Sequence, residues 1–236
     1  MSNPLQPLLG IGIDAARGLL TQVCCLCLAA SGERLLCRAC ESELPGCGQG
    51  CPVCALPTQN GAVCGACIGA PPYFDATRAA FSYAYPVDGL VHALKYRGQL
   101  ALAGLFAHKL RERIGDSAGA QLIVPLPLHP ARLAERGFNQ AVEIARVLAR
   151  LTGIPMDTQL ATRVRNTAPQ TDLPWQERVA NMRQAFACGR DLAGVSVAVV
   201  DDVMTTGATL DEFAKVLKRA GAARVENWVV ARTPRV

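Results

Sequence analysis

Four apolar residues, two acids and a threonine-rich loop follow one another in Val197-Ala198-Val199-Val200-Asp201-Asp202-Val203-Met204-Thr205-Thr206-Gly207-Ala208-Thr209. The apolar run shows no alternation, which is typical of a short strand buried on both faces of a parallel sheet. We expect this strand to end at the two acids. Apolar residues then recur at helical spacing until Gly221 ends the element. The order of strand, acids, loop and helix predicts an α/β fold.

The loop after the acids has the properties of a phosphate-binding site. A loop that leads into a helix N-terminus presents unpaired N–H groups and the positive end of the helix dipole. Two carboxylates at the end of a parallel strand instead suit hydroxyl groups or a metal ion. A ribose 5-phosphate carries hydroxyls one sugar ring away from its phosphate and therefore satisfies both halves. An ordinary buried strand with a polar turn is the alternative, and the lack of Gly-Lys-Ser/Thr in this loop disfavours an ATPase.

The same stretch closely resembles the loop with which type I phosphoribosyltransferases bind phosphoribosyl pyrophosphate (PRPP). That loop also consists of an apolar strand, two acids and Thr-Thr-Gly. The resemblance implies that Asp201 and Asp202 hold the ribose 2′- and 3′-hydroxyls of PRPP, which binds together with Mg²⁺. It further implies that the 5′-phosphate is wrapped by Thr205, Thr206, Gly207, Ala208 and Thr209.

Eight of the eleven cysteines form an internal repeat of paired C-x2-C knuckles. The first quartet is Cys24, Cys27, Cys37 and Cys40, and the second is Cys51, Cys54, Cys64 and Cys67. Two knuckles supply the four thiolates of a tetrahedral zinc site, so we expect two structural zinc ions. The spacing also permits knuckles to pair across the two quartets, and disulfides are the less favoured alternative. Cys25, Cys47 and Cys188 fall outside the repeat.

Length and composition favour one full α/β domain with a smaller module. The chain has 236 residues, half of them hydrophobic, and a formal net charge of +5. Most of its basic residues are arginine, whose planar guanidinium binds phosphate or carboxylate at two points. The chain begins without a basic region and carries Asp14 and Arg17 in its first apolar segment. We therefore expect a cytoplasmic protein with no signal peptide and no membrane insertion.

We expect three parts along the chain. Residues 1–23 have the pattern of an amphipathic helix, residues 24–70 of a double zinc ribbon, and residues 71–236 of a phosphoribosyltransferase-like domain. In the last part we expect helices around Leu90, Leu102 and Ile144, and residues 164–183 as a hood over the site. The strands expected to form one doubly wound, mostly parallel sheet are 77–85, 121–124, 185–187, 197–200 and 224–231.

A second resemblance covers residues 24–232. After the cysteine knuckles come Ala93-Leu94-Lys95-Tyr96-Arg97-Gly98, Val124-Pro125-Leu126-Pro127-Leu128-His129, Arg132, Arg136-Gly137-Phe138-Asn139-Gln140, and then Gln170, Arg178 and Asn181. This order resembles the ComF family, competence proteins that combine a double zinc ribbon with a phosphoribosyltransferase domain. The resemblance implies a PRPP-binding type of domain and a link, in competent bacteria, to the handling of incoming single-stranded DNA.

Two hypotheses about function remain open at this point. The first is an enzyme that transfers ribosyl phosphate from PRPP and releases pyrophosphate, for which the binding candidates are Lys95, Arg97, Arg132 and Arg136. Its catalytic residue stays unassigned, because a packed or capping role is favoured for His92 and for His129. The second is a non-catalytic protein that senses PRPP or a nucleotide, or that contacts single-stranded DNA or a DNA-processing partner through the zinc module.

Overall fold

The computed structural model describes residues 22–115, 119–165 and 184–234. It divides into two compact units, one ending at Leu44 and the other beginning at Pro45. Residues 1–21 of the expected N-terminal helix, nearly all of the expected hood, and Gln170, Arg178 and Asn181 lie outside the described residues, and the last two residues of that expected helix form a strand instead. In the part of the chain that is described, no helix is both long enough and apolar enough to cross a membrane.

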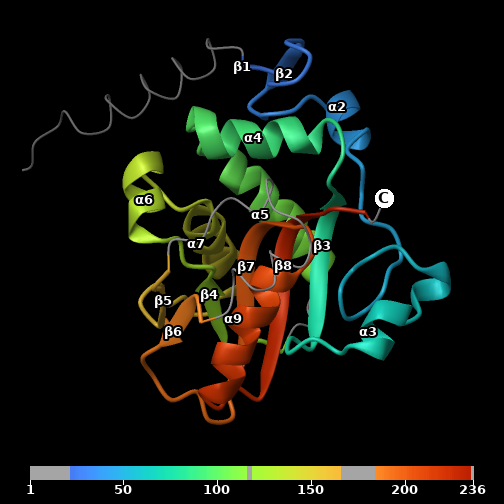
Figure 1. Ribbon diagram of the computed structural model, residues 1–236. Helices are drawn as coiled ribbons and strands as arrows, with labels where there is room; N and C mark the ends of the chain where they lie inside the picture. Colours follow the sequence, from blue (N-terminus) through green and yellow to red (C-terminus); the bar gives the residue numbers. More distant parts are fainter. Residues whose placement is uncertain (1–21, 116–118, 166–183, 235–236) are drawn as a thin grey trace, which may run out of the picture. The chain divides into compact units, whose positions relative to one another are not determined.

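The smaller unit is built around the first quartet of cysteines. Strands β1 (Gln22–Val23) and β2 (Ala30–Gly32) pair antiparallel, and helix α2 (Arg38–Ser42) follows them (Figure 1). Cys37 caps this helix, because its Sγ atom accepts a hydrogen bond from the backbone N–H of Cys40 at 3.5 Å. A segment this short buries few apolar side chains, so its stability is expected to depend on a bound metal.

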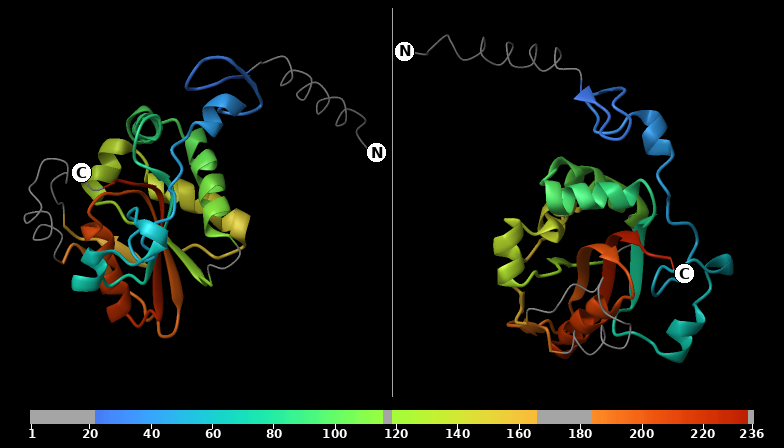
Figure 2. Two further views of the ribbon diagram at one scale, coloured as in Figure 1. Left: turned by 90° about the vertical axis from the view of Figure 1, so that its right-hand side faces the viewer. Right: turned by 45° about the horizontal axis from the view of Figure 1, so that its top comes forward.

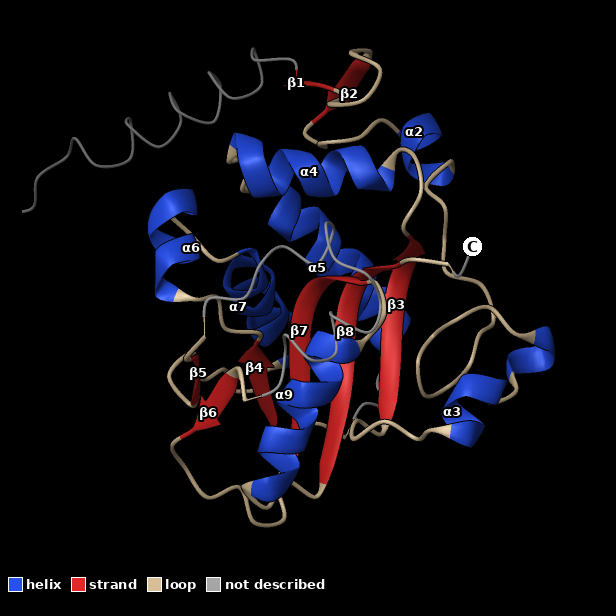
Figure 3. Cartoon of the chain, viewed as in Figure 1, coloured by secondary structure: helices blue, strands red, loops and turns tan. Residues whose placement is uncertain are grey.

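The larger unit contains a parallel sheet of four strands in the order β3-β8-β7-β4 (Figure 3). The strands are β3 (Ala76–Ser82), β8 (Arg224–Arg232), β7 (Ser196–Met204) and β4 (Leu122–Pro125). β7 and β8 lie in the middle and are mostly buried. The apolar run at the start of β7 predicts its burial, whereas β8 also buries the polar side chains of Glu226, Asn227 and Arg232. The expectation that β7 ends at the acids is wrong. It runs through both acids because β8 pairs with it as far as Met204 and Arg232.

Helices cover both faces of this sheet (Figures 1 and 2). α5 (Ala101–Ile114) and α7 (Gln140–Thr152) pack against each other and against one face, and α9 (Ala208–Arg219) packs on the other. α4 (Val87–Arg97) leads into α5 and ends at the left-handed Gly98, as its sequence predicts. The doubly wound arrangement and its three expected helices before residue 153 are therefore confirmed.

Two features of the larger unit differ from the sequence-based expectation. The sequence places 185–187 in the main sheet, which is wrong: β6 (Phe186–Cys188) pairs antiparallel with β5 (Ala161–Arg163) in a separate sheet. A three-residue apolar run does not reveal which strand it will pair with. Helix α6 (Pro130–Arg136) is also missing from the expectation. Its signals are nevertheless present, since His129 caps it, proline starts it and Gly137 ends it.

The second quartet of cysteines belongs to the larger unit. The chain before it runs beside β3, where Cys47 N–H donates to Ala80 O at 3.1 Å and Ser82 N–H donates to Pro45 O at 2.8 Å. Cys51 and Cys54 are buried in the same apolar core as Phe74. Short helices η1 (Gln59–Gly61) and α3 (Gly65–Gly69) complete the segment. The two quartets therefore lie in different compact units.

Candidate functional site

The loop between β7 and α9 has a conformation that requires glycine. Gly207 is the N-cap of α9 and adopts a φ of 87°, in the left-handed region. A Cβ atom at this position would lie 2.7 Å from Cε of Met204. The Thr206 hydroxyl accepts a hydrogen bond from Ala208 N–H at 3.2 Å, which holds the turn into the helix. The loop therefore leads directly into the N-terminus of α9. Backbone N–H groups at a helix N-terminus are the groups that bind phosphate in many proteins.

The two acids at the end of β7 differ in their surroundings. Asp202 is buried, and its carboxylate pairs with Lys95 Nζ at 2.7 Å and accepts from Gln140 Nε2 at 3.3 Å. Asp201 is less covered, and its Oδ1 accepts from the backbone N–H of Asp202 at 2.8 Å. Desolvation and the neighbouring Asp202 carboxylate raise the pKa of Asp201 to about 7. Burial alone would lower the pKa of Lys95, but the charge of Asp202 raises it above its usual range.

A basic pocket lies beside this ion pair. It is a cavity of about 210 Å³ lined by Lys95, Tyr96, Gly98, Arg132, Glu135, Arg136 and Phe138. The Arg136 guanidinium lies 5.2 Å from the centre of the Tyr96 ring, a cation–π distance that orients it. Three cationic side chains and the carboxylate of Glu135 thus line one small cavity.

The Arg-Gly-Phe-Asn-Gln motif at 136–140 builds this arrangement residue by residue. Arg136 ends α6, and Gly137 at a φ of 80° turns the chain so that Phe138 lines the basic pocket. Asn139 caps α7 by accepting from Ala141 N–H at 2.9 Å, and its amide donates to Leu126 O at 3.0 Å. Gln140 then reaches the carboxylate of Asp202. The motif connects the basic pocket to the acids of β7.

The structure brings together most of the residues that the sequence suggested. Three of the four pyrophosphate candidates line the basic pocket, whereas Arg97 is not among its lining residues. Sequence reasoning assigned no role to Gln140, although it stands in a quoted motif. It also missed Arg163 of β5, whose pKa is lowered by burial and by the charge of Arg132 and which interacts with Asp201. Arg163 lies in a strand of three residues, which is too short for its sequence pattern to indicate a role for this arginine.

Neither histidine near the site is placed as a general base. Nδ1 of His129 accepts from Ala131 N–H at 3.2 Å and so caps α6. The ring of His92 lies 4.7 Å from the ring of Tyr96 and packs on it. The capping and packing roles favoured by the sequence are the ones that the structure shows.

Each cysteine quartet forms a group that fits one zinc ion. The structure groups them sequentially rather than across the quartets, with all four Sγ atoms of a group within 4.8 Å of one another. The Sγ atoms of Cys54 and Cys64 are 3.6 Å apart, and those of Cys27 and Cys37 are 3.7 Å apart. A tetrahedral site with a Zn–S distance of about 2.3 Å requires about 3.8 Å.

One cysteine in each group has a lowered pKa, which favours the thiolate form that binds zinc, whereas the pKa values of Cys40, Cys54 and Cys67 are raised. Burial alone would raise the pKa of Cys24, but backbone N–H groups of Cys27 and Cys37 lower it to about 6. Backbone N–H groups of Cys64 and Cys54 lower the pKa of Cys51 in the same way to about 7. All eleven cysteines lie in the described part of the chain, and each is a free thiol.

A family model and solved structures match parts of this chain. The family model "Phosphoribosyl transferase domain" matches residues 133–235. Among solved structures, the purine phosphoribosyltransferase from Pyrococcus horikoshii Ot3 is similar, with 21% identity and a TM-score of 0.34 over 58% of this chain and 85% of that one.

Curated relatives match over most of the chain. The DNA utilization protein YhgH of Salmonella typhimurium is 37% identical over 78% of this chain and 84% of its own length. YhgH of Escherichia coli K12 is 34% identical over 89% of this chain and 97% of its own. Competence protein F of Haemophilus influenzae is 30% identical over 84% of this chain and 90% of its own. The chain, with its two Cys₄ groups and its phosphoribosyltransferase-type sheet, belongs to the ComF family.

Proposed function

We propose that this protein binds PRPP with Mg²⁺ at the carboxyl end of β7. The observation that carries the proposal is the position of Lys95, which pairs with Asp202 and also lines the basic pocket. One side chain thus joins the acids that suit ribose hydroxyls to the cavity that suits a polyanion. PRPP carries a 5′-phosphate, a ribose diol and a pyrophosphate on one sugar ring, so its three parts match loop, acids and pocket.

Each part of the site has a separate task in this proposal. The residues from Thr205 to Thr209 and the α9 N-terminus bind the 5′-phosphate, and Asp201 and Asp202 accept hydrogen bonds from the ribose hydroxyls. Arg132 and Arg136, with Lys95, bind the pyrophosphate. Mg²⁺ supplies further positive charge to the pyrophosphate when it is bound. If the protein is a transferase, these cations stabilise the leaving group as its charge develops.

We also propose one structural zinc ion in each Cys₄ group. The spacing of the four sulfur atoms in each group supports this assignment. Zinc would be held by thiolates of four cysteines in each compact unit and would stabilise their short turns.

Single-stranded DNA is a second candidate ligand, favoured by one observation. Tyr96 is largely exposed, with His92 and Arg136 packed on its ring next to the basic pocket. An exposed aromatic ring beside cations is the arrangement on which unpaired bases stack. The curated names of the relatives, DNA utilization protein and competence protein, point in the same direction. Under this second candidate function, the protein catalyses no reaction and acts by binding DNA or a DNA-processing partner.

The deciding experiment is calorimetry with PRPP–Mg²⁺ and with oligo-dT in parallel. Arg136→Gln is expected to weaken PRPP binding about tenfold, because it removes a charge-assisted contact to the pyrophosphate. Arg97→Gln is the matched control, since Arg97 is a neighbouring cation that does not line the pocket, and it should change affinity less than twofold. Absence of PRPP binding by the zinc-loaded protein, or equal effects of the two variants, would refute the proposal.

A further inference from the structure

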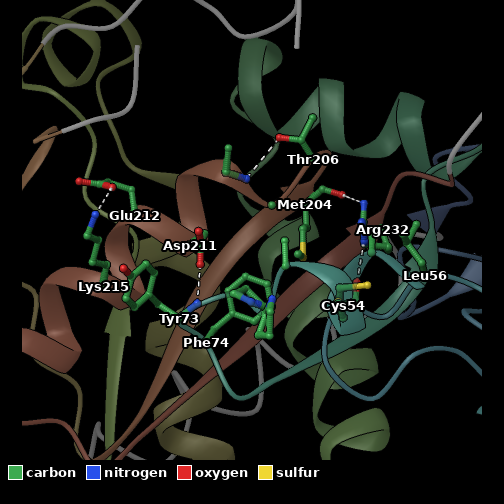
Figure 4. A pocket seen from close by; sticks show the side chains of 17 residues that line it. Cys54, Leu56, Tyr73, Phe74, Met204, Thr206, Asp211, Glu212, Lys215 and Arg232 are labelled. Carbon is green, nitrogen blue, oxygen red and sulfur yellow. Dashed lines mark hydrogen bonds and ion pairs between the residues drawn. The ribbon is translucent and has the colours of Figure 1, made fainter. Parts of the chain in front are cut away.

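The side chain of Arg232 connects the second cysteine group to the loop after β7. Arg232 ends β8 and is 4% exposed. Its Nε donates to the carbonyl of Cys54 at 2.8 Å, and its Nη1 donates to the carbonyl of Met204 at 2.9 Å and to that of Thr205 (Figure 4). One guanidinium therefore holds a peptide of the Cys51–Cys54 knuckle and two peptides of the candidate phosphate loop.

Fixing these two carbonyls also fixes the direction of two loop N–H groups. The peptide unit is planar and trans, so a carbonyl and the N–H of the following residue point in opposite directions. The Met204 carbonyl also accepts from the backbone N–H of Thr233 at 3.0 Å, whereas the Thr205 carbonyl is held toward Arg232. Arg232 therefore bears chiefly on the N–H of Thr206, which points away from it. Backbone N–H groups that bind phosphate are effective only when they are already aimed at it.

The position of the Cys54 carbonyl depends in turn on the knuckle. Cys51 N–H donates to Leu56 O at 2.7 Å, and Ala55 N–H donates to Cys51 O at 2.8 Å, which closes a tight turn around Cys54. The thiols of Cys51 and Cys54 both belong to the second group of four. A metal bound by both thiolates would lock this turn, and with it the acceptor that Arg232 uses.

The knuckle and the strand end before the loop also share one apolar core, which includes Cys54, Phe74 and Met204. A cavity of about 410 Å³ lies between them, and its walls include Cys54, Cys67, Phe74, Met204, Thr206 and Arg232 (Figure 4). The hydrogen bonds of Arg232 cross the edge of this cavity and add directed contacts to the shared packing. A second tie runs from Tyr73 N–H to the Asp211 carboxylate in the first turn of α9, at 2.6 Å.

We propose that Arg232 is a positioning residue that makes the Thr205–Thr209 loop depend on the metal state of the second cysteine group and not on that of the first. The ligand part of this inference rests on the proposed PRPP binding. The positioning part concerns the loop itself and holds in the ligand-free protein.

The test compares backbone amide exchange of the loop with PRPP affinity in zinc-loaded full-length variants. Arg232→Lys keeps the charge but loses the planar fork that reaches four carbonyls, those of Cys54, Met204, Thr205 and Thr233. It is expected to speed exchange at 205–207 and to weaken PRPP about tenfold, with the zinc content unchanged. Arg78→Lys is the control: Arg78 of β3 pairs with Glu226 of β8 in the same sheet, away from the loop.

The metal is tested with one ligand substitution in each group. Cys64→Ser should speed exchange of the loop and weaken PRPP as Arg232→Lys does, and combining the two should add little further. Cys37→Ser should remove zinc from the first group and leave the loop unchanged. Unchanged loop exchange in both Arg232→Lys and Cys64→Ser would overturn the inference, and so would an equal rise across β3, β7 and β8. If both variants speed loop exchange but the parent protein does not bind PRPP, the positioning role of Arg232 is supported and the proposed PRPP binding is refuted.

Discussion

PRPP binding should depend on pH through Asp201, whose pKa is raised to about 7. A ribose hydroxyl donates to an ionised carboxylate more strongly than to a protonated one. Ligand binding therefore requires loss of the proton that the folded protein holds on Asp201. The sign follows from linkage: affinity should rise as the pH increases through the pKa.

The size of the effect follows from the ionised fraction. With a pKa of about 7, roughly a tenth of Asp201 is ionised at pH 6 and roughly nine tenths at pH 8. The affinity for PRPP is thus expected to be about tenfold weaker at pH 6 than at pH 8. The folded state also holds this proton more tightly than the unfolded chain, whose Asp201 has the ordinary pKa of 3.8. The free energy of unfolding therefore falls as the pH rises from 3.8 to about 7 and then levels off.

Calorimetry at pH 6, 7 and 8 in saturating Mg²⁺ measures this dependence. Asp201→Asn serves as the reference, because it removes the titrating group and keeps the ionisation of the ligand phosphates. The wild-type slope should exceed that of the variant by about one decade over the range. Parallel slopes in the two proteins would show that Asp201 does not titrate against the ligand.

Four further predictions concern other parts of the molecule. Gly207→Ala should lower the free energy of unfolding by about 2 kcal/mol in urea, since it adds both a strained φ and a clash with Met204. Gly98→Ala, with open space around its Cβ position, should lose only about half as much. Asp202→Asn should cost about 2 kcal/mol of stability because it leaves Lys95 without its carboxylate, and an unchanged denaturation midpoint would contradict the ion pair. Metal analysis of reduced protein should return two zinc ions per chain, and one or none would disprove the assignment. If about six phosphates are neutralised, oligo-dT affinity should fall by orders of magnitude between 50 and 200 mM salt, and a flat response would exclude this mode of binding.

Much of the fold was predictable because it depends on local pattern. The apolar run before Asp201 has no alternation, and only a strand covered on both faces suits it. Glycines at helix ends, such as Gly98, gave the limits of the helices before the basic pocket. The sequential cysteine groups are compatible with the spacing, but the spacing alone did not exclude crossed pairing.

What could not be predicted depends on contacts between distant segments. β7 extends beyond the acids because β8 pairs with it there. The sequence of β7 alone does not indicate which strand it pairs with or how far the pairing runs. The burial of Asp202 depends on Lys95 and Gln140 from two other helices. The contact of Arg232 with Cys54 joins residues far apart in the chain. The periodicity of apolar residues predicts which face of a helix or strand is buried. It does not predict which polar group of a distant segment will contact that face.

The cysteine repeat also has an evolutionary consequence. Cys51 stands 27 positions after Cys24, and the spacing within each quartet is the same, which indicates duplication of one ancestral motif. The copies now have different neighbours: one forms its own compact unit, and the other shares the core of the sheet. Substitutions in the second copy would lower the stability of the whole larger unit, whereas the effects of substitutions in the first copy are confined to its own unit. Across descendants of this duplication, the first copy is therefore expected to diverge, shrink or acquire new partners sooner than the second.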